Sequence, residues 1–581
     1  MLSGYRWQVL ALVISVVMFG LVLGMRFMNT TEPEAVEASA TPSPTITVAP
    51  TFTPEANLPT PISNQQPAFR TENNTFTEGV ISSVQRLNPL LATTRAELDI
   101  VSLIYEGLTA INEFGEPSPD LASSWVVSRD GYEYVFDLRQ DVLWQDGTPF
   151  TADDVVFTYR LMANPDFALP EISAFWQTIE FDRLGEYRVR FRLAQPLASF
   201  PTLLTIGILP EHALGNITGG QLLNHPFNLT PIGTGPYQLE GLRSSNGQQI
   251  EGVDLRVAPN YRQRPEGAEG YAIDRFRFRL FSSFDDALDA LANGQIDGLA
   301  APTMYERPDL LRLDQVNIET QIDSTVGMLI FNWQEDEGTR FFTDLRLRNA
   351  LQLSLNRNNP VDTTLFNQAI TADSPLHPES WGYNSSLAYP QPNPMRAIEL
   401  LESANISVTE DERENDNLYA FTILTLDIPE WVAIAQNIAT QWSQFNLDVS
   451  VEAVDRTTYS ERLDASEFDT AIVEYVLGSD PDVFVYWHAD QYENGFNYGG
   501  ADNSRISELL ERARQTVSNL SRVQLYRDFQ AVFIDEVIAI PLYYPLYTYA
   551  TNARINGVQL GFISTPEDRF RTLQNWTLDA Q

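Results

Sequence analysis

The sequence predicts an α/β protein whose globular part has more than one lobe. The chain has 581 residues, and a single hydrophobic core stops growing at about 250–300 residues, so at least two cores are expected. Hydrophobic residues make up 43% of the chain and aromatic residues 11%, which is ample apolar material to bury. Between residues 420 and 475, strand-like and helix-like segments alternate, and this order produces crossover connections and a parallel sheet.

An apolar stretch near the N-terminus, residues 7–25, is long enough to cross a membrane. Its only polar side chains are Gln8 and Ser15, and a helix of this length spans ~28 Å, about the hydrocarbon thickness of a bilayer. Residues 38–40 have the form of a signal-peptide cleavage site but lie well beyond the apolar stretch. We therefore expect residues 1–28 to be an uncleaved membrane anchor with a cytoplasmic N-terminus; a cleaved signal segment is the alternative.

Residues 29–75 are predicted to form a linker rich in Thr and Pro. No apolar periodicity runs through them, so the segment cannot bury enough surface to fold, and its prolines keep it extended. As polyproline II, its central part would reach at most ~120 Å, at about 3.1 Å per residue. We expect a disordered stalk that lets the globular part move above the membrane.

The composition excludes several kinds of catalysis. All 37 basic residues are Arg, so no Lys is available for a Walker A loop or a Schiff base. Because the chain has no Cys, thiol catalysis, thiolate metal sites and disulfides are also excluded. The net charge of −40 argues against nucleic acid as a partner. We therefore expect a binding protein without a cofactor, not an enzyme. We also expect no metal site, because the four histidines lie far apart in the sequence: His212, His225, His377 and His488.

Residues 134–157 are predicted to form a strand, a turn and the start of a helix. Apolar and polar residues alternate over 134–138, which is the period of a half-buried strand. Asp146-Gly147 is a turn dipeptide, because Gly accepts a positive φ without steric cost. Thr151 stands at an N-cap position with Asp154 three residues later, which is a capping-box-like start ahead of an apolar run.

Further helix boundaries follow from capping residues. Ser283 predicts the start of a helix and Gly294 its end. Ser504 is predicted to begin another helix, and Ser521 with Gln524 predicts a capping box that opens the next one.

An alternating strand and helix pattern defines the region expected to be a parallel sheet. Apolar residues at spacings of three and four predict one helix face over 431–445. The flanking patterns predict a strand before this helix, a strand after it, then a short helix and a third strand, at residues 420–426, 447–451, 459–463 and 470–475.

A series of short motifs, in one order over nearly 500 residues, points to a known family. They lie at residues 87–89, 104–108, 119–122, 138–157, 231–237, 260–261, 294–297, 331–332, 344–357, 480–481 and 540–543. Together these motifs closely resemble the family 5 extracellular solute-binding proteins, which are the peptide/nickel/opine-type receptors of ABC importers. One such motif would be weak evidence, whereas the ordered set over roughly residues 76–560 is strong evidence.

The resemblance implies a two-lobed fold of the periplasmic-binding-protein type II-like class with an extra α/β subdomain. It implies hinges where the chain crosses between lobes, near residues 321–326 and 536–541. The implied parts are lobe I in three pieces, the extra subdomain and lobe II: residues 76–110, 221–322 and 537–581; 111–220; and 323–536.

A ligand site is expected at residues 474–482, because ligands bind beyond the carboxyl ends of parallel strands. The resemblance implies ligand contacts from the same segment. Its candidate residues are Tyr475, which offers an aromatic face with a polar end, and Ser479, Asp480 and Asp482 in a turn-forming stretch. The two carboxylates could equally serve as turn or N-cap groups.

Three other positions complete the candidate ligand-binding set. Tyr105 belongs to the family's opening motif. Trp333 follows the Phe-Asn pair at residues 331–332 and faces either the cleft or, as we favour, the core. Leu477 occupies the position where the resemblance implies an Asp that pairs with a peptide's α-amino group. A buried ammonium without a carboxylate partner is costly, so a free dipeptide is a less expected ligand.

The resemblance implies a membrane-tethered extracytoplasmic receptor on the periplasmic or cell-surface face. It would trap a peptide-like or other small solute between two lobes by hinge closure and deliver it to an ABC permease, and a monomer is expected. Two alternatives stay open: a ligand-binding sensor of the same fold that acts in signalling, and a secreted hydrolase. The sequence leaves the ligand open among peptide, metal chelate, opine and oligosaccharide.

Overall fold

The computed structural model describes residues 74–245, 247, 249–261, 271–334, 342–404, 420–493 and 495–579. The expected anchor at residues 1–28 lies outside the described residues, as does almost all of the expected linker at 29–75. Within the described ranges, no helix is both long enough and apolar enough to cross a membrane.

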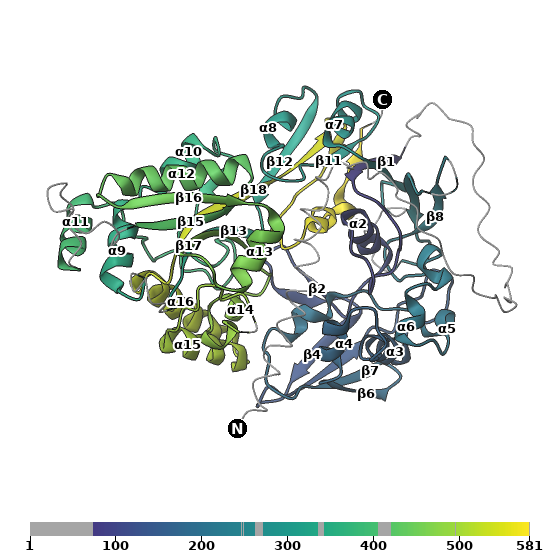
Figure 1. The fold of residues 1–581 in the computed structure, drawn as a ribbon. Coiled ribbons are helices and arrows are strands. Elements are labelled where there is room, and N and C mark those ends of the chain that lie inside the picture. The colour runs from purple at the N-terminus through teal and green to yellow at the C-terminus, as the bar shows by residue number, and fades with distance from the viewer. Residues whose placement is uncertain are drawn as a thin grey trace, which may run out of the picture.

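A mixed sheet of twelve strands connects the two halves of the described part of the chain (Figure 1). In spatial order it contains β16 (Asp448–Val454), β15 (Ala420–Leu426), β17 (Thr470–Val476), β13 (Thr325–Phe331), β18 (Ala539–Asn552), β11 (Gly298–Ala300), β1 (Thr75–Ile81), β10 (Arg275–Phe281), β9 (Gly252–Val257) and β8 (Tyr237–Arg243). Two further strands, β12 (Val316–Ile322) and β14 (Ala369–Thr371), also pair with β18.

The long strand β18 belongs to both halves. Its first part pairs with β13 and β14, and its second part pairs with β12 and β11. Its Tyr, Ile and Leu side chains are almost all buried, as expected for a strand covered on both faces. The hydrophobic cores on either side of β18 are separate: Tyr544 packs in one and Tyr547 in the other.

One hydrophobic core, which we call the second core, is formed by buried residues between 304 and 544 and includes side chains of β13 and β15–β17. These strands lie on the left of Figure 1. Strand β15 pairs in parallel with both β16 and β17, so the parallel sheet predicted from the sequence is confirmed. The helices and short 3₁₀ turn of this half are α9 (Leu345–Ser354), α10 (Asn358–Thr363), α11 (Pro394–Ser403), α12 (Pro429–Ser443), α13 (Arg456–Asp464), α14 (Phe484–Trp487), η4 (Ala489–Gln491), α15 (Ser504–Gln515) and α16 (Asn519–Asp535).

One helix start in this half was predicted wrongly. Helix α16 begins at Asn519, not at Ser521, because Ser518 takes the extended backbone conformation of an N-cap and the chain is already helical when it reaches Ser521. The predicted start of α15 at Ser504 is confirmed, and the Asn503 side chain caps it by accepting from the backbone N–H groups of Arg505 and Ile506.

The first core is drawn from residues 76–278 and 547–576. Its helices and 3₁₀ turns are α2 (Arg95–Ile104), α3 (Ala152–Met162), α4 (Pro170–Trp176), η1 (Phe200–Thr205), α5 (Glu211–Leu214), α6 (Gly219–Leu222), η2 (Pro226–Leu229), η5 (Pro566–Phe570) and η6 (Leu573–Asn575). Beside it, α7 (Phe284–Ala292) and α8 (Arg307–Leu310) cover a smaller cluster. Ser283 caps α7 as predicted, and Gly294, at φ +65°, follows its end.

A smaller antiparallel sheet shares the first core and lies at the lower right of Figure 1. Its strands are β4 (Ala122–Val127), β5 (Glu133–Leu138), β7 (Arg188–Arg192) and β6 (Glu180–Gly185), in that order. The predicted capping box is confirmed, because Thr151 and Asp154 cap α3 reciprocally. Gly147 has φ +93° in the predicted turn. Two small two-stranded antiparallel sheets complete the strands: β2 (Thr109–Ile111) with β3 (Pro117–Pro119), and β19 (Ile555–Asn556) with β20 (Thr577–Leu578).

The chain passes between the two cores in adjacent places. The first crossing separates β12 from β13 at Asp323 and Ser324. The second lies within β18 at Pro545, whose carbonyl accepts from the Asp323 N–H at 2.8 Å. Residues 537–544 pack in the second core, so this crossing is farther along than residues 536–541. The two crossings are therefore hydrogen-bonded to each other.

Candidate functional site

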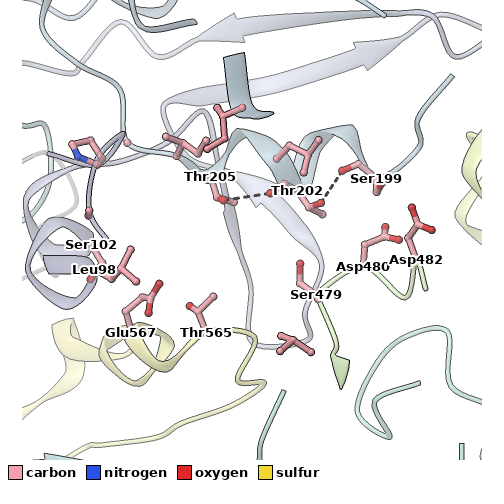
Figure 2. A pocket seen from close by; sticks show the side chains of 18 of the residues that line it. Leu98, Ser102, Ser199, Thr202, Thr205, Ser479, Asp480, Asp482, Thr565 and Glu567 are labelled. Carbon is pink, nitrogen blue, oxygen red and sulfur yellow. Dashed lines mark hydrogen bonds between the residues drawn. The ribbon is translucent and has the colours of Figure 1, made fainter. Parts of the chain in front are cut away.

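A cavity of about 310 Å³ lies between the two halves of the molecule. One wall comes from the second core side, residues 476–486. The opposite wall comes from the first core side. Three segments form most of it: α2 together with the loop before it, the separate stretch 199–207, and η5 (Figure 2). A solute in this cavity would therefore contact both halves at once.

The wall from the second core begins where strand β17 ends. Val476 is the last residue of β17, and the backbone N–H of Leu477 donates to the Ser324 carbonyl at the first crossing, at 2.6 Å. Four predicted site residues, Leu477, Ser479, Asp480 and Asp482, line the cavity. The rule that ligands bind at the carboxyl ends of parallel strands thus led to a segment that does form a cavity wall.

Asp480 and Asp482 each hold a buried arginine. The Asp480 carboxylate accepts from both terminal nitrogens of Arg522, at 2.8 and 2.6 Å. Asp482 accepts from Arg514 Nε at 2.7 and 3.0 Å. Burial by itself lowers the pKa of Arg522, but the Asp480 charge outweighs it, and the pKa stays above its usual range. Both carboxylates are therefore neutralised by the protein.

Tyr475 does not line the cavity, although it was a predicted site residue. Side chains alternate across a strand, so Val476 faces the cavity and Tyr475 the opposite side. There its ring packs on Tyr486, with centroids 4.4 Å apart, and its hydroxyl donates to the Phe496 carbonyl at 3.1 Å. The structure gives Tyr475 a place in the core.

Trp333 also lies away from the cavity. Strand β13 runs antiparallel to β17, so Thr325 pairs with Val476 beside the cavity, whereas Phe331 pairs with Thr470 at the far end. Trp333 follows that far end, and the Arg348 guanidinium stacks on its ring at 3.7 Å. Of the two predicted placements, the core is the one observed.

The last predicted residue, Tyr105, also lines the cavity, on the wall opposite Leu477. Tyr105 follows α2, and burial raises the pKa of its hydroxyl, which donates to the Leu87 carbonyl at 3.3 Å. Leu477 is 3% exposed and adds apolar surface to the opposite wall. Gly207 allows this close packing, because a Cβ there would lie 2.6 Å from the Tyr105 Cβ.

The sequence analysis did not identify the hydroxyl groups on the cavity wall that comes from the first core side. Ser102 donates to the Asp99 carbonyl at 2.8 Å. Figure 2 shows the other two bonds, from Thr202 to the Ser199 carbonyl at 2.7 Å and from Thr205 to the Thr202 carbonyl at 3.3 Å. Because each hydrogen atom is engaged within its own helix, these hydroxyls present lone pairs to a ligand. Serine and threonine on short helices carry no sequence signal for such a role.

Glu567 is another residue that the sequence analysis missed. It lies on η5 and reaches the cavity beside Leu98, Ser102 and Thr565 (Figure 2). Its Oε2 atom is covered by protein and accepts no hydrogen bond. Burial raises the pKa of this carboxyl to about 7, and the nearby Asp99 charge contributes to the rise.

The two halves also touch beside the cavity, next to the lining residues Ser199 and Arg514. The backbone N–H of Ala198 donates to the Arg514 carbonyl at the end of α15, at 2.7 Å. A Cβ on Gly131 would lie 3.4 Å from the Val517 side chain, so the β4–β5 turn approaches the α15–α16 loop. The two halves are thus in direct contact on this side of the cavity.

Over the ranges that the structure describes, no three His, Cys, Asp or Glu side chains are grouped so that they could hold a metal ion. Two histidines pair with single carboxylates: His212 with Asp146 at 2.8 Å, and His488 with Glu511 at 3.3 Å.

Comparisons with known proteins identify relatives of this chain. The family model for bacterial extracellular solute-binding proteins, family 5 (middle), matches residues 116–496. The oligopeptide-binding protein AppA of Bacillus subtilis is 24% identical over 514 residues, covering 86% of this chain and 91% of AppA. The dipeptide-binding protein of Escherichia coli is 25% identical over 493 residues, covering 79% and 87% of the two chains.

A solved structure agrees with these matches. NikZ from Campylobacter jejuni, in complex with Ni(L-His), superposes with a TM-score of 0.65 at 25% sequence identity, covering 87% of this chain and 100% of NikZ. The similarity covers a mixed α/β, two-lobed fold. The family resemblance inferred from the sequence motifs is confirmed.

Proposed function

Since the chain belongs to the bacterial extracellular solute-binding proteins of family 5, we propose that it captures a small solute between its two lobes and delivers it to an ABC permease. The proposal includes an extracytoplasmic location, a tether formed by the N-terminal segment, action as a monomer and no enzymatic step. The comparisons lend no support to the alternative of a signalling sensor.

The observation that carries this proposal is the composition of the cavity walls. Residues 476–486 belong to the second core side, and α2 and η5 belong to the first core side. A ligand that contacts both walls binds the closed state better than an open one. Because a ligand shifts a conformational equilibrium only by its differential affinity, this two-sided contact is what hinge closure requires.

The crossings between the lobes suit a hinge. They lie at residues 323–324 and at Pro545, and the hydrogen bond from Asp323 to Pro545 holds them together. Two adjacent extended connections can absorb a rotation of one lobe against the other with little change in either core. The Ala198–Arg514 hydrogen bond beside the cavity would break when the lobes separate.

The cavity volume limits the ligand class. At about 310 Å³, it lies at the lower end of the range of about 300–1,000 Å³ for small-molecule sites. A peptide-like molecule of two or three residues, or another solute of that size, agrees with this volume. Relatives named for oligopeptides and dipeptides make peptides the first class to test.

The test is to identify the bound solute and measure its stoichiometry. Native mass spectrometry of the full chain, purified without refolding, should show one solute per chain, and the released solute should rebind unchanged. The variant Thr205→Trp places a bulky side chain at the cavity and should abolish rebinding, whereas Thr440→Trp, at an exposed position of α12, should not. Solute consumption proportional to protein concentration, or equal binding by both variants, would contradict the proposal.

A further inference from the structure

The charged side chains beside Glu567 are already paired with one another. On η5, Arg569 binds Glu78 at 2.8 Å and Asp99 at 2.6 Å. On α2, Arg95 binds Asp99 at 3.1 Å. Each of these arginines therefore has a carboxylate partner, and neither forms an ion pair with Glu567.

The next acidic residue along the chain is also matched. Asp568 binds Arg571 at 2.6 Å and caps η5 through the backbone N–H groups of Ser564 and Thr565. Among the described residues around η5, Glu567 is thus the carboxylate in excess over the arginines. A carboxylate that is covered by protein and lacks a cationic partner favours its protonated form or the binding of an external cation.

The opposite wall offers Glu567 no positive charge. Its two arginines, Arg514 and Arg522, bind Asp482 and Asp480, so that side of the cavity is close to neutral. With Glu567 ionised, the charged residues that line the cavity, taken together with Arg522 behind Asp480, sum to one negative charge within the described part of the chain. The net charge of −40 on the whole chain adds a field of the same sign.

The surroundings of Glu567 supply hydrogen-bond acceptors. The Ser102 hydroxyl donates to the Asp99 carbonyl and keeps its lone pairs available, and it lies in the same corner of the cavity as Glu567 (Figure 2). A primary ammonium has three donors and no acceptor, so it complements a carboxylate beside such a hydroxyl. Leu98 in this corner can pack against the carbon adjacent to the ammonium.

We propose that Glu567 is the specificity-determining residue of the cavity and binds the ammonium group of a small cationic solute. The inference rests on the proposed solute-binding function and adds a ligand class to it. Leu477, on the wall from the second core, provides no charge for such a group. The cation is therefore recognised by Glu567, which lies on the first core side.

The same geometry makes binding of the cation depend on pH. Only the ionised carboxylate attracts an ammonium, and the pKa of Glu567 is raised to about 7 by burial, with Asp99 and Asp568 adding to the rise and Arg95 opposing it. At pH 5 roughly 1% of the Glu567 carboxyl would be ionised, against about half at pH 7. The affinity for an ammonium should therefore fall roughly 50-fold from pH 7 to pH 5.

The experiment uses matched probes that differ in one positive charge. Isothermal titration of the full chain compares dialanine with N-acetyl-dialanine, and pentylammonium with pentanol. At pH 7 at least one charged probe should bind more than tenfold tighter than its neutral partner, and Glu567→Gln should remove that preference and its pH dependence. Glu402→Gln, which removes one exposed charge on α11, should change neither.

Folding controls separate a binding role from a structural one. Because the Glu567 carboxylate has no hydrogen bond to lose at Oε2, Glu567→Gln should melt at or above the wild-type temperature at pH 7. Glu567→Asp keeps the charge and should keep part of the preference for the charged probe. A Glu567→Gln protein that melts lower would indicate a structural role and overturn the inference.

Two binding outcomes would also overturn it. If charged probes bind Glu567→Gln as well as wild type, or if no charged probe is preferred, Glu567 does not recognise a cation. In that case binding of a neutral solute would leave the proposed function standing. If native mass spectrometry finds no bound solute and no probe binds, both proposals fail together.

Discussion

Replacing Asp480 by Asn should destabilise the second lobe even when no ligand is bound. Asp480 and Arg522 form a bidentate pair whose side chains are 8% and 3% exposed. Arg522 also donates to the Ala513 carbonyl at 3.1 Å and lies over the Trp381 ring at 4.9 Å. In Asp480→Asn the guanidinium stays in this buried position without its counter-charge.

The expected size of this effect follows from that burial. Removing one partner of a buried ion pair costs about 3–5 kcal/mol, because the remaining charge is left uncompensated. For a cooperative unit of 150–250 residues, each kcal/mol lowers the melting temperature by about 2–4 °C. Asp480→Asn should therefore melt at least ~6 °C below wild type. A residue that only contacted ligand would show little loss.

The assay is thermal and urea unfolding of the full chain at pH 7 without added ligand. Asp502→Asn, which removes an exposed carboxylate from the same lobe, should stay within about 0.5 kcal/mol of wild type. The double variant Asp480→Asn/Arg522→Met removes both charges and should recover part of the loss. Melting of Asp480→Asn within 1 °C of wild type, or a double variant that shows the sum of the two single losses, would refute this reasoning.

Three further predictions concern other parts of the chain. Leu477→Asp should strengthen the binding of probes with a free α-amino group over their acetylated forms, because it adds a carboxylate to the cavity wall; unchanged selectivity in titrations would contradict this. The full-length protein should stay with membranes after high-salt or carbonate extraction, through residues 7–25; mature protein in the medium that begins after Ala40 would count against the anchor. Burial lowers the pKa of His377 to about 4, below its unfolded value near 6.5, so its contribution of roughly 3 kcal/mol is present above pH 6.5 and is lost as the pH falls towards 4. His377→Asn should flatten that part of the stability profile in urea titrations, and an unchanged slope would exclude His377 as its source.

Secondary-structure elements marked by a local sequence pattern, such as alternating apolar residues or a capping pair, were predicted from the sequence. The alternation over residues 134–138 gave strand β5, and Thr151 with Asp154 gave the start of α3. These features depend on neighbours in the chain, so they can be read without the fold. The start of α16 was harder to predict, because Ser518 and Ser521 are both suitable N-cap residues. The backbone conformation identifies Ser518 as the N-cap, and the sequence does not reveal that conformation.

The candidate site depended on tertiary facts that the sequence carries only in part. Strand polarity was enough to find residues 477–482, since the rule for parallel strands concerns the end of a strand. The Tyr475 side chain lies on the opposite face of the strand from Val476 and packs on Tyr486, and this direction could not be assigned from the sequence. The pairing of β13 with β17 puts Trp333 at the far end of the sheet, and that register is set by contacts between distant segments.

Glu567 could not be found from the sequence at all. Its surplus charge exists only because Arg569, next but one to it, is bound to Glu78 and Asp99 from nearly 500 residues earlier in the chain. The arginines that neutralise Asp480 and Asp482 are closer in the chain, 42 and 32 residues away, but no sequence pattern pairs them. Which carboxylates are available to a ligand is decided by such pairs, and they form only when the lobes fold.

The central claim is that a solute is trapped by closure of two lobes, and the distance between the lobes tests it most directly. Because the chain has no Cys, Ser123→Cys on β4 and Ser521→Cys on α16 provide two labelling positions, one in each half. In protein freed of solute by unfolding and refolding, energy transfer between the labels should rise as the released solute is added back, and it should saturate at one solute per chain. Solute binding at that ratio with no change in energy transfer would contradict the account.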